Sequence, residues 1–229
     1  TAALYGLEVL VPSINTDGDN TTRFIVLSRE KPTGGNRFSL LFTVDNKPGK
    51  LGEVIQIIGA SGFNMESIKS YDIIVKSGSL ENLYQFARLD RRVAVVTDSG
   101  VPAQYAQMVA DQCKDAHIIT VPQGEASKSF KILESVLKQM LEFGMGRGDL
   151  VIAVGGGVVG DLAGFAASIY MRGIDFINCP TTTLSMIDSS IGGKTAVDLG
   201  DTKNIVGAFW QPKLVIVDPD TLATLPRRH

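Results

Sequence analysis

The sequence predicts an α/β fold with a doubly wound parallel sheet in residues 71–229, preceded by a partial α+β segment. From Tyr71 onward, strand-like apolar runs alternate with helical patterns, which is typical of a parallel sheet covered by helices. The run DLVIAVG at 149–155 is apolar almost throughout, as expected of a strand buried on both faces.

Two further strands are expected in this region, at 91–98 (RRVAVVTD) and at 116–122 (AHIITVP). Between them a helix is expected over 101–113, with Pro102 in its first turn, where a missing N–H costs nothing. This strand–helix–strand order predicts that the two strands lie in one sheet.

The strongest helical pattern covers residues 127–144. Ser127 is the expected cap, and Gly144 is the expected end, because glycine readily adopts the left-handed conformation that closes a helix. The apolar residues at helical spacing are expected to face the core. They are Phe130, Leu133, Leu137, Met140 and Leu141.

The first seventy residues show a shorter pattern. FSLLFTV at 38–44 predicts a strand, and NMESIKS at 64–70 is a candidate for the next one. The intervening helix would place four apolar residues on one face, namely Leu51, Val54, Ile55 and Ile58. This is the beginning of a βαβ unit with too few strands to close a sheet.

Composition limits the function classes. The chain has 229 residues, 44% hydrophobic content and a formal net charge of -2, which argues against a nucleic-acid binder. No apolar run reaches the ~18 residues of a membrane span, and no cationic leader is present, so a cytoplasmic protein without membrane partners is expected. The first residue, Thr1, indicates a piece of a longer chain.

A glycine turn follows the strand at 149–155. Gly155, Gly156 and Gly157, with Gly160 three positions on, open an apolar helical run. Free N–H groups and the positive end of a helix dipole suit a pyrophosphate. The G-x-G-x-x-G pattern alone is weak, and tight strand–helix packing explains such glycines equally well. Two strand–helix units precede the turn, which differs from the simplest dinucleotide-binding arrangement.

Residues 180–209 combine a hydroxyl cluster, a second glycine pair and two lysines, Lys194 and Lys203, with little helical periodicity. A long loop of this composition predicts a site for a phosphate ester. The alternative is a solvated loop with ordinary surface lysines.

Several blocks occur together in a defined order. They are PQGEASKS, GGGVVGDLAGFAASIYMRGIDF, PTTTLSMIDSSIGGKTAVDLG, KNIVGAFWQP and TLATLP. In order and spacing they resemble the 3-dehydroquinate synthase family, the NAD-dependent cyclases of the shikimate pathway. The resemblance covers about residues 71–228, which corresponds to the NAD-binding half of that family.

The resemblance implies that NAD contacts residues in five segments. They are Asp98; Gln123, Gly124, Glu125 and Lys128; Gly155, Gly156, Gly157, Val158, Val159, Gly160 and Asp161; Thr181 and Thr182; and Thr221, Leu222, Ala223 and Thr224; Lys194 and Lys203 are added to them. Asp161 would meet both cofactor and substrate; the alternative is that it only favours the dipole in the first turn of its helix.

The resemblance also implies the catalytic residues for a phosphorylated sugar-acid substrate. They are Asp188, Lys194, Lys203, Asn204 and Arg172. The implied reaction is a transient oxidation of a ring hydroxyl by NAD, elimination of phosphate, re-reduction, ring opening and an aldol closure. Oxidation matters because a ketone acidifies the adjacent C–H bond.

The family also uses zinc or cobalt, bound by one glutamate and two histidines in a helical second domain, and the complete enzyme is implied to be a homodimer. His229 stands where the family has an acid, and His117 opens a predicted strand. No metal ligands are therefore expected here, and this chain alone is not expected to turn over.

Residues 1–36 resemble the end of a prephenate dehydratase domain, in which Thr22 matches a catalytic threonine. Residues 37–70 resemble the first part of an ACT domain, a ferredoxin-like module. PGKLGE stands at its phenylalanine-binding turn, and IKS lacks the Arg-Pro expected after it. The domain boundaries are thus predicted at 1–36, 37–70 and 71–229.

Two origins of this combination stay open: a recombined product of neighbouring genes, and a natural fusion in which the ACT piece senses an aromatic amino acid. Alternative functions are a phenylalanine-binding regulatory fragment, another sugar-phosphate cyclase and a polyol dehydrogenase. The dehydrogenases should lack DSSIGGKTA with KNIVGAF, because they eliminate no phosphate.

Overall fold

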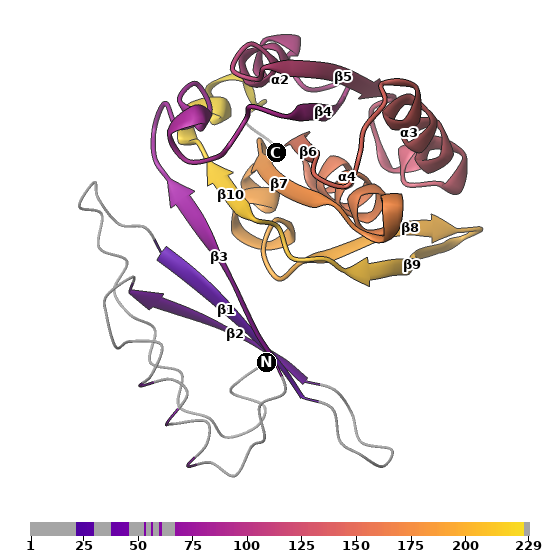
Figure 1. The fold of residues 1–229 in the computed structure, drawn as a ribbon. Coiled ribbons are helices and arrows are strands. Elements are labelled where there is room, and N and C mark those ends of the chain that lie inside the picture. The colour runs from indigo at the N-terminus through magenta and orange to yellow at the C-terminus, as the bar shows by residue number, and fades with distance from the viewer. Residues whose placement is uncertain are drawn as a thin grey trace.

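The described residues of the computed structural model are 71–226 in full, the backbone of 22–29, 38–45 and 67–70, and the single positions Glu53, Gln56 and Ala60. Within them an eight-stranded sheet has the order β2-β1-β3-β10-β7-β6-β4-β5, and β8 and β9 form a separate two-stranded sheet. Figure 1 shows this pair beside α4. None of the described helices combines the length and the apolar character that a membrane crossing requires.

The elements have the following bounds. The strands are β1 Thr22–Arg29, β2 Phe38–Asp45, β3 Ser67–Val75, β4 Arg92–Asp98, β5 Asp115–Val121, β6 Leu150–Gly155, β7 Asp175–Pro180, β8 Lys194–Leu199, β9 Thr202–Phe209 and β10 Leu214–Val217. The helices are α2 Ala103–Ala110, α3 Phe130–Glu142 and α4 Gly157–Ile169. Shorter helical turns are η2 Leu83–Gln85, η3 Glu125–Ser127, η4 Tyr170–Arg172, η5 Ser185–Ser189 and η6 Pro219–Thr224.

The six strands from β3 to β5 run parallel, which confirms the predicted sheet. Every residue of β6 is buried, because both faces of the sheet are covered. On one face the core includes residues of α3 and α4, and on the other it includes residues of α2. The two helical layers therefore exclude ligands from both faces of the main sheet.

The predicted bounds of the elements between residues 91 and 155 agree with the structure within a few residues. The predicted N-cap of α3 is wrong. Ser129, not Ser127, occupies the N-cap position, and Ser127 belongs to η3, where its Oγ donates to Pro122 O at 2.5 Å. The predicted stripe is wrong at two positions, because Phe130 is 45% and Leu141 69% exposed. The buried residues of α3 are Leu133, Val136 and Met140. Gly144, with φ +75°, ends the helix as expected.

Residues 180–209 do not form the expected long loop. They contain the π-helical turn η5 and the antiparallel pair β8–β9, which meet through Lys194↔Phe209 and Val197↔Val206. One side of the pair packs against α4, since Val197 is fully buried and Val206 packs on the same core. A strand is recognised in a sequence by apolar residues that alternate with polar ones. This alternation is weak in β8 and β9, because the face turned away from α4 carries both polar and apolar residues.

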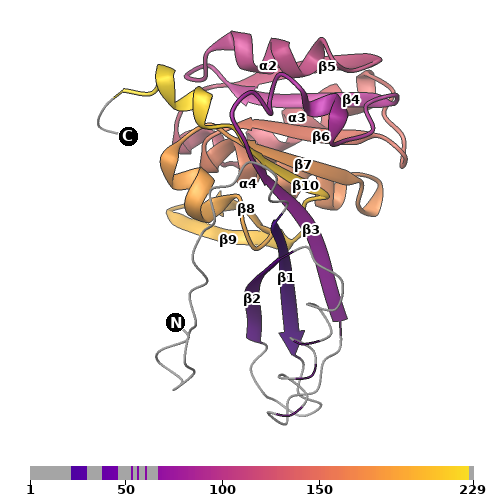
Figure 2. The same cartoon turned by 90° about the vertical axis from the view of Figure 1, so that its left-hand side faces the viewer.

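The N-terminal strands add to the same sheet. β1 lies between β2 and β3 and is antiparallel to both, so β2 and β3 run parallel to each other. Figure 2 shows these strands extending away from the main body along β3. Strand β3 runs without a break through residues 67–75, across the predicted boundary at 70/71. The apolar face predicted for the helix after β2 lies outside the described residues; Glu53, Gln56 and Ala60 are helical and exposed.

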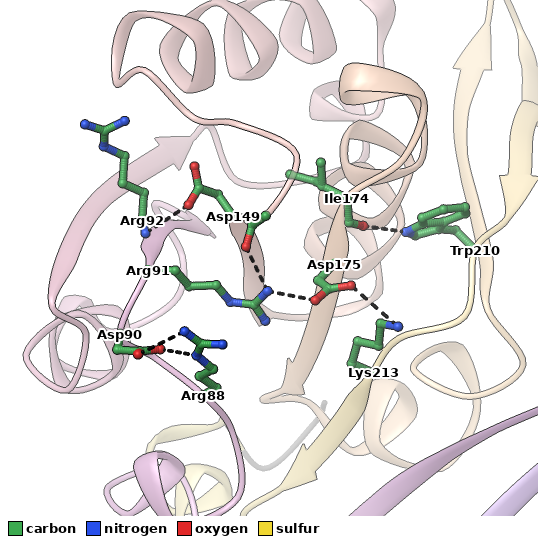
Figure 3. Close-up of polar contacts among 10 residues, drawn as sticks. Arg88, Asp90, Arg91, Arg92, Asp149, Ile174, Asp175, Trp210 and Lys213 are labelled. Carbon is green, nitrogen blue, oxygen red and sulfur yellow. Dashed lines mark hydrogen bonds and ion pairs between the residues drawn. The ribbon is translucent and has the colours of Figure 1, made fainter.

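Polar contacts hold the amino ends of the parallel strands together (Figure 3). Arg91 Nη1 donates to Asp175 Oδ2 at 2.7 Å and to Gly148 O at 3.0 Å. Lys213 Nζ lies 3.6 Å from Asp175 Oδ1, and Trp210 Nε1 donates to Ile174 O at 3.0 Å. These contacts join the loops before β4, β6, β7 and β10, at the edge of the sheet opposite the glycine turn.

Close approach of α4 to its neighbours yields a stability prediction. A Cβ at Gly164 would lie 2.5 Å from Thr195 Cγ2 and 3.1 Å from the Phe176 ring. Overpacking costs about 1–3 kcal/mol, and the better helix propensity of Ala returns at most about 1 kcal/mol. We therefore expect Gly164→Ala to lower the free energy of unfolding by up to about 2 kcal/mol, measured by urea denaturation. Gly148→Ala is the control, since a Cβ there meets no atom within 4 Å. Unchanged stability of Gly164→Ala would show that α4 can shift at no cost.

Candidate functional site

The glycine turn lies at the point where the strand order of the sheet reverses. The chain goes from β4 outward to β5, and then crosses to β6 on the other side of β4. In open α/β sheets, ligands bind outside the carboxyl ends of the strands at such a switch point. The turn after β6 and the loop after β4 flank this crevice, which explains why two strand–helix units precede the glycines.

Three of the glycines are required by packing within the protein. A Cβ would meet Val159 Cγ2 at 2.7 Å from Gly155, Ser189 Oγ at 2.9 Å from Gly157, and Asn178 Nδ2 at 3.0 Å from Gly160. Gly156 differs, because a Cβ there would make only a 3.4 Å contact with Thr182. It is the N-cap of α4 and provides no side-chain cap, so the first N–H groups of the helix keep their capacity to bind an anion.

A cavity of about 460 Å³ lies over the side of α4 that faces β8 and β9. Its walls come from the second turn of α4, from the end of η5 and from the two strands. They are Asp161, Asp188, Ser189, Ile191, Lys194, Thr195, Ala196, Asn204, Ile205, Gly207, Ala208 and Phe209. The structure thus brings together four residues that the sequence nominated: Asp161, Asp188, Lys194 and Asn204.

A buried lysine lies beside this cavity and joins three segments. Lys128 follows η3 and is 4% exposed; its Nζ donates to Asp161 Oδ2 at 2.7 Å and also to Asn204 Oδ1. A buried ammonium needs such oxygen partners, because desolvation of an isolated charge costs several kcal/mol. The pairing fixes the turn after β5, the second turn of α4 and the start of β9 relative to one another.

Asp198 supports this arrangement from β8. Its backbone N donates to Lys128 O at 2.8 Å, and its Oδ1 accepts from Asn204 N at 2.8 Å. Asn204 has φ +56°, a conformation that few residues other than glycine adopt. The carboxylate of Asp198 therefore stabilises a strained backbone that presents the Asn204 amide to Lys128.

Burial raises the pKa of Asp161 above its usual range. The ion pair with Lys128 acts in the opposite direction, and the nearby charges of Glu125 and Asp198 raise the pKa further. The cost of desolvation is therefore larger than the attraction of one lysine. Asp161 lies beyond the first turn of α4, which contains no acidic residue, so the simple dipole explanation considered for it does not hold.

The other nominated cofactor residues line the same edge of the sheet. Asp98 Oδ1 accepts hydrogen bonds from Gly100 N at 2.7 Å and Val101 N at 3.2 Å. One carboxylate oxygen of Asp98 therefore stabilises the loop after β4. Glu125 Oε1 lies 3.4 Å from Lys203 Nζ in an exposed ion pair. Gln123 and Gly124 are exposed in the same turn as Glu125.

Thr181, Thr182 and the η6 segment make mainly local contacts. Thr181 N donates to Gly155 O at 2.9 Å, which ties β7 to the glycine turn. Thr182 Oγ1 lies 2.8 Å from Ser185 Oγ and supports η5. The Tyr105 hydroxyl lies 3.0 Å from Thr224 Oγ1, while Leu222 is partly buried and Ala223 is exposed.

Two nominated catalytic residues, Arg172 and Lys203, are not among the described residues that line the cavity. Arg172 is exposed in η4, beyond the end of α4, whose last residue, Ile169, lies roughly 12 Å from Asp161 along the helix axis. The backbone of Thr22 is described at the start of β1, but its side chain lies outside the described residues. His117 packs against Phe143, with ring centroids 5.5 Å apart, and His229 also lies outside the described residues.

Two residues at the site were not predicted. Ser189 lines the cavity, and its buried Oγ has no hydrogen-bond partner among the described residues. Asp198 positions Asn204, as described above. The repeated serines in DSSIGG next to Asp188 were a usable signal for Ser189, whereas the role of Asp198 depends on the unpredicted β8–β9 pair.

The fold and the glycine turn define a class: the doubly wound α/β domains that take ligands at the switch point of the sheet. Residues 118–229 match the family model described as 3-dehydroquinate synthase N-terminal. The 3-dehydroquinate synthase of Lactiplantibacillus plantarum is 49% identical over 168 residues, which cover 70% of this chain and 47% of that protein.

Two solved structures are similar over a comparable share of the chain. A 2-deoxy-scyllo-inosose synthase complexed with carbaglucose-6-phosphate, NAD+ and Co2+ is 30% identical, with a TM-score of 0.67, over 70% of this chain and 46% of that one. The 2-epi-5-epi-valiolone synthase of Streptomyces hygroscopicus, with NAD+ and Zn2+ bound, is 34% identical, with a TM-score of 0.64, over 73% and 48%. The chain spans about half the length of these relatives.

The raised pKa of Asp161 predicts a pH-dependent stability. Because this pKa is higher in the folded than in the unfolded chain, the stability that the group contributes is present at low pH and is lost as the pH rises through the folded value. We expect the Tm of the wild type minus that of Asp161→Asn to fall as the pH rises above about 4, the ordinary pKa of an aspartate. A difference that grows with pH would mean that Lys128 outweighs the burial.

Proposed function

We propose that this chain carries the NAD-binding and phosphate-binding part of a 3-dehydroquinate synthase, a carbon–oxygen lyase. The reaction is the conversion of 3-deoxy-arabino-heptulosonate 7-phosphate into 3-dehydroquinate and phosphate. One observation carries this proposal: the cavity gathers Asp161, Asp188, Lys194 and Asn204 beside the glycine turn, and these residues come from separate motifs of the family. The identity of the curated relative supports the same reaction.

NAD is the proposed cofactor, with its pyrophosphate at the amino end of α4. The uncapped N-terminus at Gly156 fits an anion, and the loops after β4, β5, β7 and β10 reach the same edge of the sheet. Asp98, Lys128, Thr181, Thr182 and the segment 221–224 are the proposed contacts there. NAD supplies a hydride acceptor that also returns the hydride, and the chain's residues provide its orientation.

The proposed substrate is a phosphorylated sugar acid that binds in the cavity. Lys194 and Asn204 line this cavity, so one cation and one amide are available to a phosphate group. Lys203 is not among the lining residues and pairs with Glu125, so its proposed contact with the substrate needs this ion pair to open. Asp188 is placed to accept a hydrogen bond from a sugar hydroxyl. The unpartnered Ser189 Oγ supplies a further donor at the same wall. Arg172 lies beyond the far end of α4, so it could contact the substrate only outside the described cavity.

A metal does not fit the described residues of this chain. Within the described part of the chain, no group of three or more His, Cys, Asp or Glu side chains could hold a metal ion. We therefore derive no step through zinc or cobalt. The homodimer implied by the family and a cytoplasmic location are parts of the proposal.

For residues 1–70 we propose the end of a prephenate dehydratase followed by part of an ACT domain. The support is the motif order in the sequence, including NTTRF around Thr22 and PGKLGE. Strands β2 and β3 run parallel with β1 between them, but β1 belongs to the 1–36 segment, so this strand order crosses the predicted boundary at 36/37. Phenylalanine is the proposed ligand of this segment.

NAD binding is the first test of the proposal. We expect calorimetric heat and a rise in Tm on titration with millimolar NAD, since a ligand that binds only the folded state stabilises it. Asp161→Ala should weaken the affinity at least about tenfold, which corresponds to 1.4 kcal/mol. Asp90→Ala is the control, because Asp90 is exposed and pairs with Arg88. Absence of both heat and stabilisation in the wild type would contradict the proposed cofactor.

Phosphate recognition is the second test. Lys194→Gln should weaken binding of inorganic phosphate and of 3-deoxy-arabino-heptulosonate 7-phosphate about tenfold or more, because a charge-assisted contact is lost. Lys138→Gln on α3 is the control, since Lys138 is exposed and pairs with Glu134. Glucose 6-phosphate, measured by the same titration, distinguishes another sugar-phosphate cyclase. Tighter binding of glucose 6-phosphate than of the sugar acid would favour that alternative.

A further inference from the structure

Tyr71 connects strand β3 to the wall of the cavity. It is 4% exposed, and its hydroxyl accepts a hydrogen bond from Gly192 N at 2.9 Å across 121 positions of the sequence. Burial raises the pKa of Tyr71, so the hydroxyl stays neutral near pH 7 and acts through this hydrogen bond rather than through charge. No pattern in the sequence assigns Tyr71 a role in a site.

The loop that Tyr71 holds joins two parts of the cavity. Gly192 and Gly193 have φ +95° and +67°, and they lie between Ile191 and Lys194, which both line the cavity. Two glycines in succession leave the backbone many alternative conformations, so the loop needs external contacts to keep one of them.

The contacts on this loop come from two directions. On one side, Gln211 Nε2 donates to Gly192 O at 3.0 Å, and Trp210 N donates to Gly193 O at 2.8 Å. On the other side, the Tyr71 hydroxyl receives the Gly192 N–H. The Tyr71 ring also belongs to an apolar cluster with Met186, against which Ile191 packs. Tyr71 therefore supports both η5, which ends beside Asp188, and the glycine pair that leads to Lys194.

We propose that Tyr71 is a positioning residue for the phosphate-binding cavity: its hydroxyl fixes Gly192 and thereby sets the separation of Lys194 from Asp188 and Ser189. This inference rests on the proposed function of the cavity. The positioning of Gly192 is assigned to the Tyr71 hydroxyl. The ring has a separate role, because it fills the apolar cluster with Met186 whether or not the hydroxyl is present.

Tyr71→Phe isolates that hydroxyl, and Tyr170→Phe is a matched control. Tyr170 is also buried, and its hydroxyl donates to one backbone oxygen, Met145 O, at 3.0 Å; neither residue lines the cavity. Each variant loses one hydroxyl–backbone hydrogen bond and keeps its ring. We therefore expect both to fold, with similar small decreases in Tm.

The two variants should differ in ligand binding and local exchange. With the full chain, we expect Tyr71→Phe to bind inorganic phosphate about fivefold or more weakly by calorimetry and to exchange amide hydrogens faster at 190–194, because Gly192 is released. Tyr170→Phe should match the wild type in both measurements. Phosphate affinity of Tyr71→Phe equal to that of the wild type would overturn the role of Tyr71 while leaving the proposed function intact. If the wild type itself binds no phosphate, the proposed site fails, and the role of Tyr71 in it fails with it.

Discussion

The site depends on one buried cation, the ammonium of Lys128. It contacts Asp161 and Asn204, and it has almost no access to water. Removing one partner of such a buried pair typically costs about 3–5 kcal/mol, since the other charge remains without compensation. The three segments that carry these residues are therefore placed relative to one another by charge as well as by apolar packing. The β8–β9 pair must lie against α4 for Asn204 to reach Lys128, and this placement also closes one wall of the cavity.

Small residues on α4 make this close placement possible. Ala163 and Ala167 belong to the core that also contains Val197 of β8, Gly164 is buried on the same helix, and the space beside it is occupied by Thr195 and Phe176. A larger side chain there would move the hairpin outward and stretch the contacts of Lys128. The small size of these residues therefore supports the site indirectly, because it lets the β8–β9 pair lie close to α4.

The elements from 91 to 155 could be predicted because their signals are local: continuous apolar strands, a Pro at a helix start and Gly144 at a helix end. The β8–β9 pair could not, since β9 exposes Lys203, Asn204 and Ile205 in succession and shows no alternation at that end. The sequence pattern predicts Ser127 as a cap because any serine before an apolar stripe fits it. Its hydrogen bond to Pro122 O shows that the η3 turn competes for the same hydroxyl.

Residue types at the site could be predicted from motifs, but their partners could not. Lys128 meets Asp161 and Asn204 across 33 and 76 positions, and Tyr71 meets Gly192 across 121, so no local pattern reports these contacts. The glycine turn shows the same limit. A motif cannot separate a glycine that admits a ligand from one that admits a neighbouring side chain, and the structure assigns Gly155, Gly157 and Gly160 to Val159, Ser189 and Asn178. Gly157 can serve both purposes, because the Ser189 hydroxyl against it is itself unpartnered and lines the cavity. Packing at the turn thus places a donor where an anion at the start of α4 could use it.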